Sequence, residues 1–212
     1  MKSTSITSLV LVNLIPVFGV LFLGWNLGQI LVLYWSENLV IGILNILKIL
    51  RAKGVPKPGS PATLRVNGKP VNPRSPNYSI SLASFFALHY GIFTAGHGVF
   101  VFTYFAQNYS LGFTELFWGF CSLFVSHWIS YRVNYIGSGE YLKATPDSQM
   151  LQPYKRIIIL HLTIILGGAF IQNSGVSTAQ SIIPLLVLVG VKTFIDVSKH
   201  IAEHTKFLKP AV

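Results

Sequence analysis

Long stretches without any charged side chain constrain this sequence more than any other feature. Residues 3–36, 75–114, 116–131 and 157–191 contain no Lys, Arg, Asp or Glu. Several of these stretches exceed the roughly 20 residues that an α-helix needs to cross a bilayer. Only 10% of the 212 residues are charged, whereas a soluble domain usually carries about a quarter. The chain is therefore expected to be an integral membrane protein.

Six transmembrane helices fit these stretches, which predicts an all-α membrane bundle. The expected spans are residues 6–24, 27–50, 80–106, 112–135, 156–173 and 178–203. Residues 51–79 are rich in Pro, Gly, Lys and Arg and form the only long connection, which is expected to be irregular. Residues 1–212 are thus expected to form a single transmembrane domain with one basic loop.

Lys and Arg are confined to one side of this topology. They occur in the connections after spans two and four and after span six, whereas the three opposite connections contain none. Because basic loops remain cytoplasmic, both termini and the 51–79 loop are expected in the cytoplasm, with the protein integral to the inner (cytoplasmic) membrane. The same asymmetry accounts for the net charge of +10 without a nucleic-acid partner.

The last expected span carries candidate metal ligands at helical spacing. Asp196, His200 and His204 recur at every fourth residue, so an α-helix stacks them on one face. Lys192 lies one turn before Asp196. Ionisable groups within a bilayer cost several kcal/mol unless they are partnered, so the other polar residues in the spans are the candidate partners.

A helical rise of about 1.5 Å per residue sorts these polar residues into two layers. The inner layer holds His127, His161, Lys192, Asp196 and His200. The middle layer holds Glu37, Asn38 and His89, with His97 further outward. Imidazole and carboxylate groups suit transition metals, with zinc favoured and iron or copper as alternatives. The pattern therefore predicts a metal site in the cytoplasmic half of the bundle.

The spacing suggests which residues share the ion. Asp196 and His200 reach one ion together, with His161 as the third ligand and His89 or His127 as the fourth. His89 and His97 are too far apart along the axis to share one ion easily, so His97 serves a separate site or role. Glu37 is a ligand, a carboxylate that orients an imidazole, or a catalytic general base.

Each of these residues also has an ordinary structural explanation. Lys192 and Asp196 neutralise each other if they pair within the inner leaflet. His204 is more simply a solvated residue at the end of a helix. His127 lies next to Trp128 in the aromatic belt of the membrane interface. His97, between two glycines, hydrogen-bonds a carbonyl of a neighbouring helix.

Four phrases resemble an uncharacterised family of bacterial polytopic membrane proteins, a domain of unknown function. They are YWSEN from Tyr34, HYGIFTAGHG from His89, LHLTIILGG from Leu160 and KTFIDVSKH from Lys192. The resemblance covers most of the chain apart from the basic loop. It implies that the family's motifs contain Glu37, Asn38, His89, His97, His161, Lys192, Asp196 and His200, but not His127 or His204. It implies no activity.

A looser similarity links the chain to zinc-dependent membrane hydrolases related to alkaline ceramidases and adiponectin receptors. Those proteins also combine intramembrane histidines with an aspartate. This chain departs from them in having six expected spans rather than seven and a different order of motifs. The similarity concerns the chemistry alone.

The leading hypothesis is a membrane metalloprotein, either a hydrolase in which Glu37 shuttles a proton for attack on a lipid-borne ester or amide, or an oxidoreductase acting on a lipid or quinone. One alternative is a proton- or ion-coupled transporter or channel, with a path lined by Glu37, His89, His97, Lys192 and Asp196. A further alternative is a b-type haem held by His89 and His161. The expected partners are the lipid bilayer and, through small-residue faces on spans three and five, a second copy of the chain.

Overall fold

The computed structural model describes residues 18–19, 22, 24–56, 65–66, 68–73, 75, 77–105, 112–154, 157–158, 161 and 190. The chain divides into two compact units, one made of Met1–Ile30 and Leu162–Val212 and the other of Leu31–His161. Most of the described residues belong to the second unit. Most of the expected spans 6–24, 156–173 and 178–203 lies outside the described residues, and the single-domain organisation stays a prediction.

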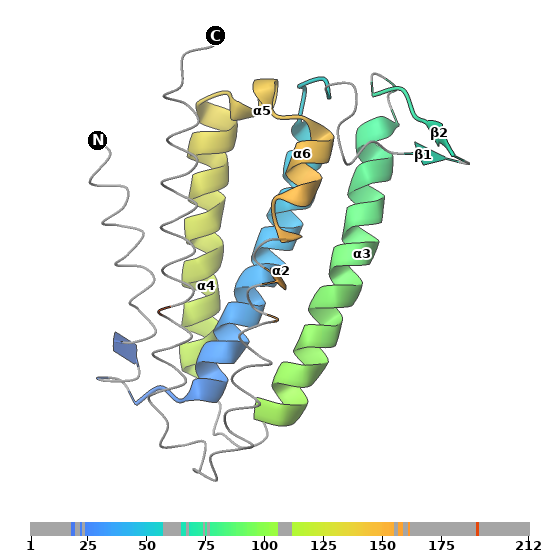
Figure 1. Cartoon of the computed structure of the whole chain (residues 1–212). Coiled ribbons are helices and arrows are strands. Elements are labelled where there is room, and N and C mark those ends of the chain that lie inside the picture. The colour runs from blue at the N-terminus through green and yellow to red at the C-terminus, as the bar shows by residue number, and fades with distance from the viewer. Residues whose placement is uncertain are drawn as a thin grey trace. The chain divides into compact units, whose positions relative to one another are not determined.

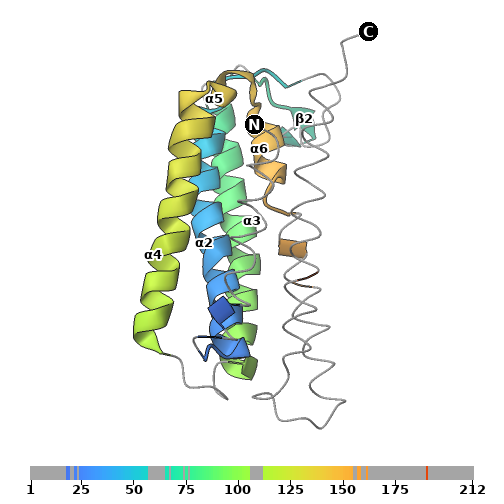
Figure 2. The same cartoon turned by 90° about the vertical axis from the view of Figure 1, so that its left-hand side faces the viewer.

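Three long helices account for most of the described chain. α2 runs over Leu27–Arg51, α3 over Tyr78–Phe100 with a π-helical extension η1 at Val101–Phe105, and α4 over Phe113–Ser130 with a π-helical extension η3 at Tyr131–Gly137. These bounds confirm helices where spans two, three and four were expected. In two views at right angles, α2 lies between α3 and α4 (Figure 1, Figure 2).

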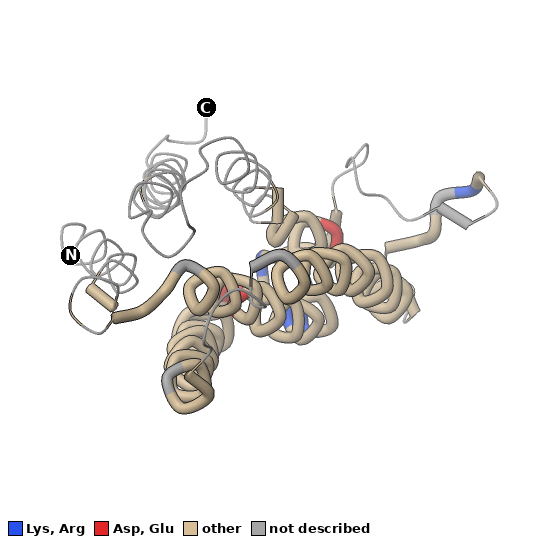
Figure 3. Tube along the Cα trace, turned by 90° about the horizontal axis from the view of Figure 1, so that it is seen from below, with Lys and Arg blue, Asp and Glu red and all other residues tan. Residues whose placement is uncertain are grey.

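Two of the described helices are long and apolar enough to cross a membrane. They are Gly28–Arg51, with a mean hydropathy of 1.8, and Tyr78–Thr103, with a mean hydropathy of 1.4. Viewed along the helices, charged residues interrupt the described tube at only a few places (Figure 3). The described part of the chain is therefore mostly helical and contains two helices of membrane length.

The start of α2 is fixed by a reciprocal pair of side-chain caps. The Gln29 backbone N–H donates to Asn26 Oδ1 at 2.9 Å, and the Asn26 backbone N–H donates to Gln29 Oε1 at 2.9 Å. Such caps satisfy backbone donors that have no partner within the helix. They end the preceding turn, where Gly24 adopts a positive φ of 67°.

The long basic connection is not wholly irregular. β1 (Arg65–Val66) pairs antiparallel with β2 (Lys69–Pro70), and Gly68 in the turn between them has a φ of 75°. The expectation of an irregular loop is thus corrected by a short hairpin. Its turn requires a left-handed residue, which glycine adopts without steric cost.

Two short helices follow η3. α5 covers Glu140–Lys143 and α6 covers Pro146–Leu151. Thr145 caps α6 in a capping box with Ser148, and Pro146 occupies the first turn, where it needs no hydrogen-bond donor. The connection that was expected between spans four and five therefore contains two helices.

The segment from Pro146 onward packs against α2 and α3 rather than remaining at the surface. The core cluster contains Ile49, Tyr78, Leu82, Ala83, Phe86, Tyr90, Met150 and Ile157. Asn45 of α2 donates through Nδ2 to the Gln149 carbonyl at 3.0 Å, and Asp147 is only 2% exposed. The chain is thus already buried against α2 and α3 from Pro146, about ten residues before the expected start of span five at residue 156.

Candidate functional site

The α2–α3 contact is built by a tryptophan that crosses between the helices. Trp35 donates through its indole N–H to the Thr94 carbonyl at 2.8 Å, and Thr94 donates through Oγ1 to the Tyr90 carbonyl at 2.8 Å. A Cβ at Gly98 would lie 2.8 Å from the Trp35 ring. The absence of a side chain at Gly98 is therefore what lets the indole lie against α3.

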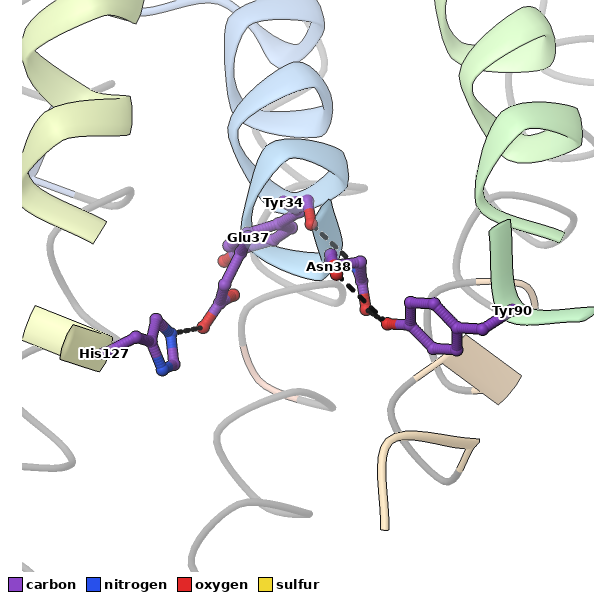
Figure 4. Close-up of polar contacts among 5 residues, drawn as sticks. All are labelled: Tyr34, Glu37, Asn38, Tyr90 and His127. Carbon is purple, nitrogen blue, oxygen red and sulfur yellow. Dashed lines mark hydrogen bonds and ion pairs between the residues drawn. The ribbon is translucent and has the colours of Figure 1, made fainter. Parts of the chain in front are cut away.

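Asn38 and Tyr90 add a second buried link between these two helices. Asn38 Nδ2 donates to the Tyr34 carbonyl of its own helix at 2.8 Å, and the Tyr90 hydroxyl donates to the Asn38 carbonyl at 3.2 Å. The side chains of Tyr90 and Asn38 approach to 3.5 Å (Figure 4). Both residues are buried, so their hydrogen bonds fix how α2 and α3 face each other.

Glu37, the residue before Asn38, points the opposite way, toward α4 (Figure 4). The His127 Nε2 lies 3.2 Å from Glu37 Oε1, with the two side chains 24% and 12% exposed. In this geometry the imidazole N–H donates to the carboxylate. An acidic residue in a helix of membrane length is thus partnered by a histidine from the next helix, as intramembrane charges require.

His97 and His161 form a second pair of ionisable side chains. The His97 Nε2 lies 2.8 Å from the His161 Nδ1, and the two rings are perpendicular. The other ring nitrogen of His97, Nδ1, lies 2.7 Å from the Phe93 carbonyl of its own helix. Since a carbonyl only accepts, His97 Nδ1 carries the proton and Nε2 presents a lone pair toward His161.

His89 lies apart from both pairs. Its Nδ1 is 2.8 Å from the Tyr154 hydroxyl, and its ring stacks on Phe85 with centroids 5.4 Å apart. The side chain is exposed. His89 therefore belongs to an aromatic group on the outer face of α3 and is separate from the His97–His161 pair.

The structure brings together a different set of residues from the expected layers. His161 lies beside His97 and not in an inner layer. The reason is that the segment leading to His161 already packs along α3 from Pro146. His127 meets Glu37 because α4 continues as η3 to Gly137, which places His127 further from the helix end than a span ending at residue 135 implied. Counting rise per residue gave only approximate depths, because η3 ends two residues beyond the expected end of span four and the segment before residue 156 is already packed.

Several predicted ligands lie outside the described residues. They are Lys192, Asp196, His200 and His204. Within the described part of the chain, no three His, Cys, Asp or Glu side chains gather closely enough to hold a metal ion. The predicted ligand set therefore contributes one described pair, His97 with His161.

Sequence reasoning missed some residues that organise these contacts. The sequence offers His127 either as a fourth ligand or as an interfacial residue, and it gives Trp35 and Tyr90 no role at a site. Tyr90 follows His89 directly in one of the four phrases, which was a usable signal. The Thr-Pro-Asp-Ser run at 145–148 was another, because its capping residues mark a helix start.

These observations define a class: a helical protein with helices of membrane length. Its ionisable side chains form pairs between segments that are distant in sequence. The chain belongs to a family of unknown function, described as Family of unknown function (DUF6498), whose model matches residues 1–212. The resemblance to an uncharacterised family is thereby confirmed. No curated protein and no solved structure matches the chain. The roles of the four phrases and the similarity to ceramidase-like hydrolases stay predictions.

Proposed function

We propose that this protein is a multi-pass membrane protein that binds a transition metal ion through His97 and His161. The observation that carries the proposal is the 2.8 Å separation of His97 Nε2 and His161 Nδ1, contributed by residues 64 positions apart. Neutral imidazole nitrogens suit zinc, iron and copper, so two imidazoles that approach each other through ring nitrogens are a plausible start for such a site.

The orientation of His97 favours ligation. Histidines that bind metals usually donate their second ring N–H to a carboxylate, carbonyl or water, and His97 Nδ1 lies 2.7 Å from the Phe93 carbonyl. Two nitrogens bound to one zinc ion at about 2.0–2.1 Å in tetrahedral geometry lie roughly 3.3 Å apart. The rings need to separate by about half an ångström to admit an ion, after which His161 carries its proton on Nε2.

The same separation argues against a haem between the two rings. Two axial nitrogens on opposite sides of one metal would lie about 4 Å apart, with a macrocycle between them. His89, the other haem ligand suggested by the sequence, contacts Tyr154 and not His161. An ion bound from one side by both rings fits better, with zinc favoured and iron or copper as alternatives.

Asp196 and His200 keep their predicted role as metal ligands on the strength of their spacing alone. His97 lies in the last turn of α3, which moves the proposed site away from the cytoplasmic half in the expected topology. Glu37 contacts α4 and is assigned no role at the metal here. Lys192 and His204 keep their predicted places as a charge partner and a helix-end residue.

The proposed membrane architecture has six spans with both termini in the cytoplasm of the bacterial cell. Its support is the exposed apolar surface of α3 and α4, where Leu88 is 68% exposed, Trp118 65% and Phe113 81%. Water would make such surfaces costly, whereas lipid tails cover them. In addition, Lys48 of α2 lies over the ring of Tyr135 in η3, and Lys53, just after α2, lies over the ring of Tyr141 in α5. Basic residues thus gather at one end of these helices, as the positive-inside rule leads us to expect.

A metal held by few protein ligands keeps positions open for water or substrate. We extend the proposal to a metal-dependent hydrolysis or oxidation of a lipid-borne substrate that enters from the bilayer, with a quinone as the redox alternative. A second copy of the chain is the remaining proposed partner.

Metal content tests the proposal directly. Protein purified without chelators is expected to hold about one transition-metal ion per chain by elemental mass spectrometry. His97→Ala and His161→Ala are expected to lose most of it, whereas the matched control His89→Ala retains it. Less than about a tenth of an equivalent in the wild-type protein, or equal content in all three variants, would contradict the proposal.

A further inference from the structure

The exposed face of α3 carries a polar pair in the middle of an apolar surface. His89 lies halfway along α3, Tyr78–Phe100, and its Nδ1 is 2.8 Å from the Tyr154 hydroxyl. We propose that His89 and Tyr154 bind the ring of a lipid-soluble quinone that approaches from the bilayer. This inference rests on the membrane architecture proposed above and does not depend on the metal site.

The surface around His89 is apolar and open. Phe85, Leu88, Ile92 and Phe93 surround His89 at helical spacings of three and four residues, so they share one face of α3 with it. All four side chains are exposed. Residues 75–114 contain no charged side chain. In the proposed membrane, this face of α3 is therefore open to molecules that dissolve in lipid.

The pair cannot satisfy its own hydrogen bonds. A neutral imidazole and a phenol carry two donors between them, one N–H and one O–H. If the Tyr154 hydroxyl donates to His89 Nδ1, the Nε2–H is left over, and if His89 donates from Nδ1, the hydroxyl hydrogen is left over. Neither side chain has a second hydrogen-bond partner in the described part of the chain. One donor therefore remains in either tautomer.

An unused donor at this place calls for an acceptor from the lipid phase. It is costly in hydrocarbon, because no water is present to accept the bond. His89 lies about 16 Å along the helix from either end of α3, and the hydrocarbon layer is about 30 Å thick. The ester carbonyls of phospholipids, at the membrane surface, are thus far from His89. The acceptor has to belong to a molecule that enters the hydrocarbon layer itself.

Aromatic side chains on both sides of His89 favour a flat ring. The Phe85 ring stacks on the imidazole, with centroids 5.4 Å and planes 11° apart, and the Phe93 ring lies one turn further along α3 at 5.1 Å. Planar rings pack well against the faces and edges of such side chains. A flat ring that bears carbonyl acceptors and an apolar tail is the chemical description of a quinone.

Tyr154 is held in place before any ligand arrives. Its ring makes edge-on contacts with Phe86 and Tyr90, at centroid distances of 6.0 Å and 6.1 Å. Both of these residues are buried in the core of the second unit. A hydroxyl fixed in this way costs a ligand little ordering on binding.

Other occupants of this face fit less well. A lipid acyl chain would cover the phenylalanines, but it has no acceptor for the unused donor. A helix of a second copy would bring backbone carbonyls that are already bonded within that helix. A fatty acid has an acceptor but no ring. These differences can be tested by competition.

Photoaffinity labelling tests the site. The full-length protein in phosphatidylcholine nanodiscs is illuminated with an azidobenzoquinone that carries a short isoprenoid tail, and the labelled residues are identified by peptide mass spectrometry. The label is expected on residues 85–93 or on Tyr154. Excess ubiquinone with the same tail is expected to prevent labelling, whereas an isoprenoid alcohol or a fatty acid at the same concentration is expected to leave it unchanged.

Substitutions separate polar recognition from apolar packing. His89→Leu removes both ring nitrogens and is expected to lower labelling at a subsaturating probe concentration about tenfold. The matched control His89→Gln keeps an N–H donor and is expected to stay within about threefold of the wild type. Tyr154→Phe removes the hydroxyl and is expected to lower labelling about fivefold. Tyr141→Phe, on α5, is expected to label like the wild type.

Labelling that His89→Leu and Tyr154→Phe leave unchanged would overturn the proposal, as would equal competition by the alcohol or the fatty acid. Circular dichroism checks that each variant is folded, and if His89→Leu does not fold, Tyr154→Phe decides. Metal content is measured on the same samples. Specific labelling of protein that holds no metal would contradict the metal proposal alone, and bound metal without specific labelling would contradict the quinone proposal alone.

Discussion

The two sides of α2 both place polar groups between apolar helices, but they partner those groups differently. Toward α3, neutral donors on Trp35 and Tyr90 reach backbone carbonyls, and glycines let the rings approach closely. Toward α4, a carboxylate meets an imidazole. The bonds of the first kind join neutral groups, whereas the second contact joins two side chains of types that can carry charge. One helix thus makes neutral hydrogen bonds and close ring packing on one side and an ionisable pair on the other.

The largest effect on this comparison is expected from Gly98→Ala. The added Cβ would lie 2.8 Å from the Trp35 indole, and a rigid ring held by a hydrogen bond cannot move aside without losing that bond. The free energy of unfolding is expected to fall by about 1–3 kcal/mol. Thermal unfolding in detergent, followed by circular dichroism, measures the change. An unchanged Tm would mean that the α2–α3 contact is looser than described.

A smaller effect is expected from Trp35→Phe. The substitution keeps an aromatic ring but removes the indole N–H that donates to the Thr94 carbonyl. The expected loss is about 1 kcal/mol, the usual value of one such bond. The same unfolding measurement applies, with Trp118→Phe as the control because Trp118 is 65% exposed. Equal losses in both variants would show that the bond contributes nothing particular to α2–α3 packing.

The smallest effect is expected from Gly119→Ala on the α4 side. Its Cβ would meet the far end of the Leu33 side chain at 2.6 Å, and a leucine can change rotamer to make room. A loss of less than about 0.5 kcal/mol is expected. The contrast with Gly98→Ala is the informative quantity. A loss as large as that of Gly98→Ala would mean that both faces of α2 are packed equally rigidly.

The helices themselves could be read from the sequence, because uncharged runs of membrane length leave few alternatives. The residues of α6 could not, since Asp147, Ser148 and Gln149 look like a solvated loop until Thr145 is recognised as a cap. Burial of Asp147 depends on packing against distant segments, which no local pattern reports.

The candidate site could be read only in part. Its residue types were evident, because histidines and a carboxylate are rare in apolar helices. Their pairing was not, for two physical reasons. Consecutive residues on a helix differ by about 100° in direction, so Glu37 and Asn38 face different neighbours, and a helix that is apolar all round gives no sign of which is which. In addition, the position of His161 depends on where the segment before it begins to pack against α3, which the sequence does not reveal.

An experimentally determined density map of the metal-loaded protein tests the central claim most directly. The account predicts an ion between His97 and His161, about 2 Å from His97 Nε2 and from His161 Nδ1. A map from protein saturated with zinc in which the two rings remain in direct contact at 2.8 Å, with no ion between them, would contradict it.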